Sequence, residues 1–211
     1  MTTVAPTSAV PRSFGSSPTA SPPPGGPRPF TVDEYQKLTR SGILSEEDSV
    51  ELLEGWIVYK MPREPQHDMV AKLVEKAIEA VLGSGWHTRG QSAITTADSE
   101  PEPDVAVVAG DIRNYGQTHP RPADISLIVE VAVSSLARDR DLKGRLYARA
   151  GIPVYWIINL NDLSIEVYTD PSGPVALPTY RQRRDYSAGE VVPLMIPGQN
   201  PVAIKAGDLL P

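Results

Sequence analysis

The stretch Ile125-Ser-Leu-Ile-Val-Glu-Val-Ala-Val133 decides the fold. It is an apolar run of strand length, rich in β-branched residues, so it predicts a central strand of a sheet. Glu130 interrupts the run with a carboxylate. Burying an unpaired carboxylate is costly, so Glu130 needs a cation, a hydrogen-bond network or an opening to solvent. The stretch therefore predicts both the centre of the fold and a group that lies opposite Glu130.

A second apolar run, residues 104–109, supplies a partner for Glu130. Asp104 opens this run directly after Pro103, so we expect it at one end of a neighbouring strand. Two converging carboxylates suit a hard ion with oxygen ligands, Mg²⁺ or Mn²⁺, which keeps waters and accepts a phosphate oxygen. A structural interpretation competes, in which Asp104 caps a turn and Glu130 pairs with an arginine. The pattern alone leaves both interpretations open.

A helix is predicted over residues 139–150, where apolar residues share one stripe. Lys143 lies one turn after Asp139, and an exposed pair between them is worth only ~0.3–0.5 kcal/mol. In the functional interpretation Lys143 folds back over the carboxylates and neutralises charge that develops on a phosphate. Asp139 would then be an accessory residue of the same site.

The segment from Arg138 to Arg149 is the strongest local basic patch, with five Lys or Arg side chains against two Asp. Such a patch suits a polyphosphate chain, although a solvated helix face shows the same pattern. A smaller group on residues 181–184 has the same ambiguity. The residues predicted to contact nucleic acid are Arg138, Arg140 and Arg145.

The rest of the chain predicts the elements around these residues. Thr31 and Glu34 make a capping box that starts a helix, and Gly42 ends it. The apolar residues on either side of Glu54-Gly55 predict a hairpin. The further predicted elements are a helix over 67–82, one or two strands within 86–96, strands over 154–159 and 164–169, and short strands with a final turn after residue 171. This order predicts an α/β fold, a mixed β-sheet flanked by helices.

His67 opens the predicted helix over residues 67–82. It is a candidate for binding phosphate or a water near the metal, although a lone histidine at a helix N-terminus is more often structural. We therefore treat it as an accessory candidate.

The first 29 residues differ from everything that follows. They hold eight prolines with Ser, Thr and Gly between them and almost no large apolar residues. Such a segment cannot bury enough surface to offset the entropy lost on ordering. We predict a disordered tail over residues 1–29 and a single domain over residues 30–211.

Composition excludes several classes of protein. The absence of cysteine excludes disulfides, thiolate zinc sites and cysteine nucleophiles, and it indicates the cytoplasm. No apolar run approaches the ~20 residues of a membrane span. The formal charge of −6 argues against a general polyanion binder, so any nucleic-acid contact must be local. Motifs for phosphate-cradling loops, dinucleotide binding, serine nucleophile elbows and His-Glu-x-x-His zinc sites are missing from the sequence.

Three strings together carry a resemblance to a known family. They are Pro103-Asp104-Val-Ala-Val-Val108, Leu127-Ile-Val-Glu130-Val131, and Asp139-x-x-x-Lys143-x-x-x-Tyr147-Ala-x-Ala-Gly151-Ile-Pro153-x-Tyr155-Trp156. The chain resembles the Uma-type restriction endonuclease family, within the PD-(D/E)XK nuclease superfamily. The resemblance covers essentially everything after the tail, and the third string is its most specific part.

The resemblance implies roles for particular residues. Asp104 and Glu130 would be metal ligands, Lys143 the catalytic lysine on a helix, and Glu51 an acidic residue from the N-terminal part of the fold. The chain departs from the wider superfamily at Ala132, where the signature lysine usually lies, so Lys143 must replace it from the helix. The implied function is a Mg²⁺-dependent or Mn²⁺-dependent endonuclease that hydrolyses phosphodiester bonds in DNA, and a homodimer is compatible with it.

Two other functions compete with this one. A catalytically inactive nuclease-fold protein that acts as a binding module fits the acidic composition. A glycosidase with two carboxylates would need aromatic platforms along a sugar cleft, and only eight Tyr, three Trp and two Phe are available. We rank the glycosidase last.

Overall fold

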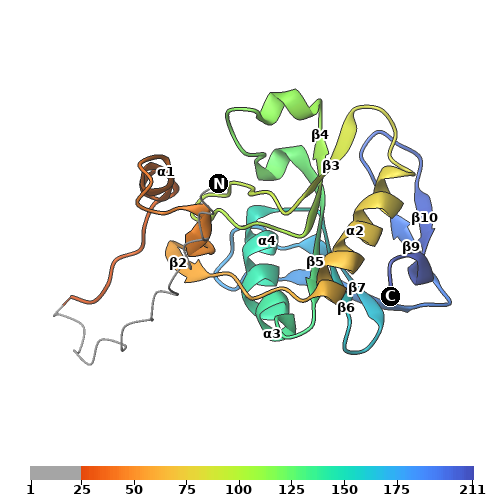
Figure 1. Cartoon of the computed structure of the whole chain (residues 1–211). Coiled ribbons are helices and arrows are strands. Elements are labelled where there is room, and N and C mark those ends of the chain that lie inside the picture. Colours follow the sequence, from red (N-terminus) through yellow and green to blue (C-terminus); the bar gives the residue numbers. More distant parts are fainter. Residues whose placement is uncertain (1–24) are drawn as a thin grey trace, which may run out of the picture.

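A six-stranded mixed sheet forms the centre of the fold, in the order β3-β4-β5-β6-β7-β8 (Figure 1). The structure, a computed structural model, describes residues 25–211, so most of the predicted tail lies outside the described residues. The strands are β3 (Trp86–Gly90), β4 (Val105–Ala109), β5 (Ile125–Ala132), β6 (Val154–Asn159), β7 (Ser164–Pro171) and β8 (Tyr180–Ser187). Only the β5–β6 pair is parallel, and the other neighbours are antiparallel. The predicted mixed sheet flanked by helices is confirmed.

Strand β5 is buried along its whole length, as its apolar sequence predicts. The chain then crosses over to β6 through one helical segment, as a parallel pair requires. This segment has three parts: α3 (Leu136–Arg138), a π-helical turn (Asp139–Lys143) and α4 (Gly144–Ala150). The helix predicted over residues 139–150 therefore begins three residues earlier, and its first part is wound as a π-helix.

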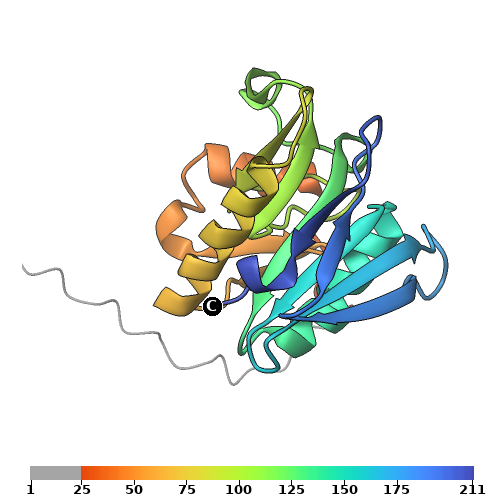
Figure 2. The same cartoon turned by 90° about the vertical axis from the view of Figure 1, so that its right-hand side faces the viewer.

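Helices lie on both sides of the central sheet (Figures 1 and 2), and each face of the sheet carries its own apolar core. Helix α2 (Pro65–Glu79) covers one face with Val70, Val74 and Ile78. The crossover segment covers the other face with Leu146 and Tyr147. Helix α2 begins two residues before the predicted start at residue 67, because Pro65 is favourable in its first turn. It ends three residues before the predicted end at residue 82.

The N-terminal part adds helix α1 (Val32–Arg40) and the hairpin of β1 (Val50–Leu53) and β2 (Trp56–Tyr59). The predicted capping box is present, since Thr31 and Glu34 bond reciprocally. Glu54 and Gly55 both have positive φ, 50° and 81°, which the tight turn of this hairpin requires. A Cβ on Gly55 would collide with Pro29, so the chain before α1 packs directly on the turn.

The C-terminal part contributes more sheet than the sequence suggests. Strand β8 has eight residues and extends the central sheet, whereas we expected only short strands there. A second hairpin, β9 (Val191–Leu194) with β10 (Val202–Lys205), packs beside α2 (Figure 2). Short 3₁₀ turns lie at Glu46–Asp48, Ile112–Tyr115, Pro122–Asp124 and Ala206–Asp208. Within residues 25–211, no helix has the length and apolar character needed to cross a membrane.

Candidate active site

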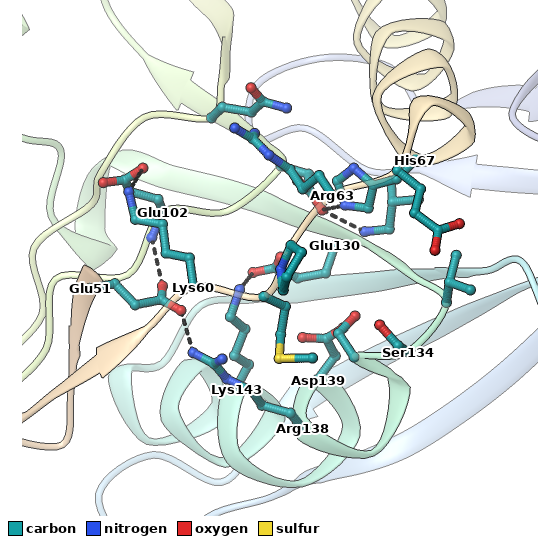
Figure 3. A pocket seen from close by; sticks show the side chains of 18 residues that line it. Glu51, Lys60, Arg63, His67, Glu102, Glu130, Ser134, Arg138, Asp139 and Lys143 are labelled. Atoms are coloured by element: carbon teal, nitrogen blue, oxygen red, sulfur yellow. Dashed lines mark hydrogen bonds and ion pairs between the residues drawn. The ribbon is translucent and has the colours of Figure 1, made fainter. Parts of the chain in front are cut away.

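A pocket of about 100 Å³ lies where β4 begins and β5 ends, between the β2–α2 connection and the π-helical turn (Figure 3). Charged side chains dominate its lining. Among the described residues the acids are Glu51, Glu64, Glu102, Asp104, Glu130 and Asp139, and the Lys or Arg side chains are Lys60, Arg63, Arg138 and Lys143. With six carboxylates against four cations, the pocket has a formal charge of −2 when His67 is neutral.

The strand register brings Asp104 and Glu130 together. In the antiparallel pair of β4 and β5, Val105 is opposite Val129, so one further step places Asp104 opposite Glu130. Opposite residues of such a pair point to the same face with Cβ atoms ~4.5–5.5 Å apart. Asp104 also accepts a hydrogen bond from the Val131 amide through Oδ2, at 2.8 Å, so it bonds to β5 rather than capping a turn.

Glu130 is almost fully buried, and two donors hold one of its oxygens. Lys143 Nζ and the Tyr147 hydroxyl donate to Oε1 at 2.8 and 2.7 Å. Burial raises the pKa of Glu130 to about 8, against the opposing effect of Lys143. Asp104 and Asp139 contribute to this raised pKa, because a second negative charge nearby disfavours ionisation. The partner cation of Glu130 is therefore a lysine and not the arginine of the structural interpretation.

Lys143 points into the pocket from the π-helical turn, toward Glu130 (Figure 3). Only 7% of Lys143 and 2% of Asp139 are exposed, so the interpretation of an exposed surface pair is wrong. Burial alone lowers the pKa of Lys143, but Glu130, Glu51 and Asp139 together raise it above its ordinary value. The ammonium therefore stays charged inside the pocket. Burial raises the pKa of Asp139 in the same surroundings.

The remaining accessory candidates reach the same pocket. His67, in the first turn of α2, places Nε2 3.1 Å from Asp104 Oδ2. Burial lowers the pKa of His67, but the hydrogen bonds and negative charges of Asp104 and Asp68 together outweigh burial and raise the pKa above its ordinary value. Glu51 on β1 is ion-paired with Arg138 and accepts a hydrogen bond from the Glu102 amide at 3.2 Å. One pocket thus contains all six predicted catalytic and accessory side chains: Asp104, Glu130, Lys143, Glu51, His67 and Asp139.

The arginines predicted to contact nucleic acid do not form one patch. Arg138 lines the pocket through its pair with Glu51. Arg140 is paired with the buried Glu166 on β7, and Arg145 with Glu54 in the turn of the first hairpin. Each of the three therefore also stabilises a different part of the fold.

Tyr147 is the contact of the site that our sequence analysis missed. It was noted only as part of the family string, although the spacing Lys143-x-x-x-Tyr147 places both side chains on one helix face. That spacing places Tyr147 next to Lys143 on the helix, but it does not by itself place the Tyr147 hydroxyl against Glu130. The sequence analysis also missed Lys60 and Glu102, which form an ion pair on the pocket wall with Lys60 Nζ 2.6 Å from Glu102 Oε2.

The possible metal donors are two carboxylates and not a larger cluster. Within residues 25–211, no three His, Asp or Glu side chains converge closely enough to hold an ion by themselves. The hydrogen bonds described above all fall on Oδ2 of Asp104 and Oε1 of Glu130. Oδ1 and Oε2 are therefore the oxygens through which these two residues could hold an ion.

The mixed sheet and its acidic pocket define a restriction-endonuclease-like α/β protein. A family described as "Putative restriction endonuclease" (Uma2) matches residues 32–201, and the chain belongs to this family. A crystal structure described as "a putative nuclease belonging to DUF820 from Anabaena variabilis" shares the fold with a TM-score of 0.62. The two chains are 18% identical over 86% of this chain and 97% of the other. No curated protein matches the chain.

Proposed function

We propose that this protein is a divalent-metal-dependent endonuclease that hydrolyses phosphodiester bonds in DNA. The observation that carries the proposal is the meeting of Asp104 and Glu130 in one pocket, with Lys143 Nζ 2.8 Å from Glu130. Membership of a restriction endonuclease family supports nuclease activity. Metal dependence rests on the chemistry of the pocket, and the choice of DNA rests on the description of the family as restriction endonucleases.

The donor set fits Mg²⁺ or Mn²⁺. Mg²⁺ usually keeps several waters and is held by one or two carboxylates together with substrate phosphate oxygens. Asp104 Oδ1 and Glu130 Oε2 would provide those two carboxylate ligands. The pocket volume of about 100 Å³ leaves space for an ion and waters, since a water needs ~10–15 Å³.

A bound divalent ion would polarise the scissile phosphate and lower the pKa of a coordinated water. The protein's own groups orient the reacting parts. Lys143 and Tyr147 hold Glu130 by one oxygen, and the Val131 amide holds Asp104 by one oxygen. Lys143 remains protonated, so its ammonium can donate to the oxygen on which negative charge develops. Contact of Arg138, Arg140 and Arg145 with the DNA backbone remains a prediction.

The test combines cation titration with DNA cleavage. We expect purified protein to bind Mn²⁺ or Mg²⁺ in isothermal calorimetry and to nick plasmid DNA. Asp104→Asn and Glu130→Gln should each lower cation affinity at least tenfold, since even the partners of metal ligands contribute about 10–100-fold. Glu47→Gln removes an exposed carboxylate outside the pocket and is the matched control.

The outcome that overturns the proposal is a wild-type protein that neither binds a divalent cation nor cleaves DNA. The nuclease fold would then serve as a binding module. Cation binding that is unchanged in Asp104→Asn and Glu130→Gln would likewise remove both residues from the metal site.

A further inference from the structure

The connection between β2 and α2 forms one rim of the pocket. We call residues Tyr59 to Arg63 the rim segment. Lys60, Met61 and Arg63 line the pocket directly, and the Tyr59 carbonyl accepts a hydrogen bond from Arg138, which lines it too. The rim segment is thus fixed at the mouth of the proposed active site.

The rim segment exposes apolar surface that no packing among residues 25–211 explains. Tyr59 is 69% exposed and Met61 42% exposed, although both are large and apolar. They alternate with the cations Lys60 and Arg63. Lys60 forms an ion pair with Glu102. Arg63 is held less tightly, because its Nε lies 3.9 Å from Asp68 Oδ1 and the side chains of Arg63 and Asp68 are each about half exposed. An aromatic ring close to a loosely held cation, here Arg63, is typical of a surface that binds a nucleic-acid strand.

Charge alone would bind a DNA duplex weakly here. Duplex affinity comes mostly from Lys and Arg at phosphates, and it grows with the number of phosphates contacted. The chain has a formal charge of −6, and most arginines near the pocket are already ion-paired. Another source of affinity is therefore needed, and stacking of a base on an aromatic ring, which uses no phosphate charge, provides one.

The size of the pocket places the bases outside it. About 100 Å³ accommodates an ion, its waters and the oxygens of one phosphate, but not a nucleobase as well. A base next to the phosphate must therefore lie outside the pocket, and over the rim it would meet the exposed side chains of Tyr59 and Met61. In a duplex the π-faces of bases are already covered by their neighbours, whereas an unpaired base offers its face to a ring.

We propose that the rim segment binds single-stranded DNA, with an unpaired base stacked on Tyr59 beside Met61 and flanking phosphates at Lys60 and Arg63. This inference rests on the proposed function, since it assigns the substrate of that same pocket. Two cations at phosphates of a single strand give a slope of about −1.4 in log affinity against log salt. The expected binding is therefore selective for single strands and only weakly dependent on salt.

The experiment is fluorescence anisotropy with a labelled 12-nucleotide DNA strand, its duplex and an RNA of the same sequence, in EDTA and at several salt concentrations. Wild-type protein should prefer the DNA strand to the duplex. Tyr59→Ala should weaken binding of the strand about fivefold or more, and Tyr59→Phe should preserve it. Leu177→Ala removes an apolar side chain that is 84% exposed and does not line the pocket, so it is the matched control.

Each outcome bears on the proposal. Equal affinity of wild type and Tyr59→Ala for the strand, a preference for the duplex with steep salt dependence, or a preference for RNA would overturn it. None of these results touches the proposed function, which is judged by cation binding and by cleavage of DNA, whether plasmid or single strand. Because Tyr59 is mostly exposed, thermal melting should show that its variants are folded.

Discussion

Lys143 is a buried lysine whose ammonium contacts a carboxylate in the pocket where substrate is proposed to bind. Its charge is set by the surrounding acids, which raise its pKa despite burial. Lys143→Met keeps most of the side-chain length and removes the charge. We expect this variant to lose at least about 100-fold in plasmid cleavage, because a donor aimed at developing charge contributes about 10²–10³ in rate.

Cleavage by Lys143→Met should be compared with that of Lys205→Met, which changes an exposed lysine on β10. Cation titration separates two possible roles. If Lys143 acts on the phosphate, the variant should still bind Mn²⁺, and its defect should lie in the rate. Wild-type cleavage by Lys143→Met would remove Lys143 from the mechanism.

At the scale of residues, the sequence identified the carboxylates but not everything that holds them. Glu130 was conspicuous because a charge interrupts an apolar strand, and Asp104 because it opens the next apolar run. Tyr147 gave no comparable signal, since an aromatic residue on a helix is expected in a core whether or not its hydroxyl has a partner. The hydroxyl contact depends on how the helix lies over the sheet, which spacing alone does not determine.

Among the elements, the π-helical turn Asp139–Lys143 is decisive for the site. It turns both of its end residues toward the pocket. The Tyr155 hydroxyl, from β6, donates to the Asp139 carbonyl at 3.1 Å, which satisfies a backbone acceptor in the irregular turn. Gly144 follows the turn, and a Cβ at this position would meet the Asp139 carbonyl and the Tyr155 ring at ordinary contact distances.

Two glycines give a matched test of this local geometry. A Cβ on Gly144 would lie 3.4 Å from the Asp139 carbonyl oxygen, an ordinary contact, and its φ of −56° is helical. Gly144→Ala should therefore stabilise the fold by ~0.4–1 kcal/mol. Gly55→Ala should destabilise it by more than ~1 kcal/mol, because φ is +81° and Pro29 blocks the Cβ.

Urea unfolding followed by circular dichroism measures both changes. Cleavage assays of the folded Gly144→Ala variant then show whether the added methyl displaces Lys143. A Gly144→Ala variant that is less stable than wild type would show that the close approach of Tyr155 is strained rather than relaxed.

The sequence predicted most elements correctly and failed at two of them for physical reasons. The π-helical turn differs from an α-helix by a small change in winding over five residues, which an apolar stripe cannot resolve. Strand β8 was missed as a strand of the central sheet because Tyr180-Arg-Gln-Arg-Arg-Asp-Tyr-Ser187 is mostly polar. Its place depends on pairing with β7, which is tertiary information.

Across the whole molecule, a polar network joins the crossover segment to the sheet behind it. Glu166 on β7 is fully buried and accepts hydrogen bonds from Arg140, Tyr168 and Asn159. Burial alone would raise the pKa of Glu166, but these donors lower it below its ordinary value. Arg183 on β8 adds an ion pair of 3.3 Å. The network ties three segments that are distant in sequence.

Because of this network, we predict that the folded protein loses part of its stability at acid pH. Folding lowers the pKa of Glu166, so ionised Glu166 stabilises the folded protein at pH values above its unfolded-state pKa of ~4.3. This stabilisation is lost as the pH falls through the pKa that Glu166 has in the folded state. Glu166→Gln should lower the free energy of unfolding by ~1–3 kcal/mol at pH 7 and by less at pH 3. Urea unfolding at both pH values checks this, and Glu47→Gln should change neither midpoint. An equal loss at both pH values would contradict the prediction.

The placement of β8 has a consequence for self-association. As the last strand of the central sheet, β8 has an open edge, and such edges invite strand addition by another chain and thereby aggregation. Exposed charges on Arg181, Arg183, Arg184 and Asp185 oppose this, because a second β8 laid alongside would bring like charges together. The polarity that concealed β8 in the sequence therefore protects the sheet, and a homodimer, if one forms, should use a different surface.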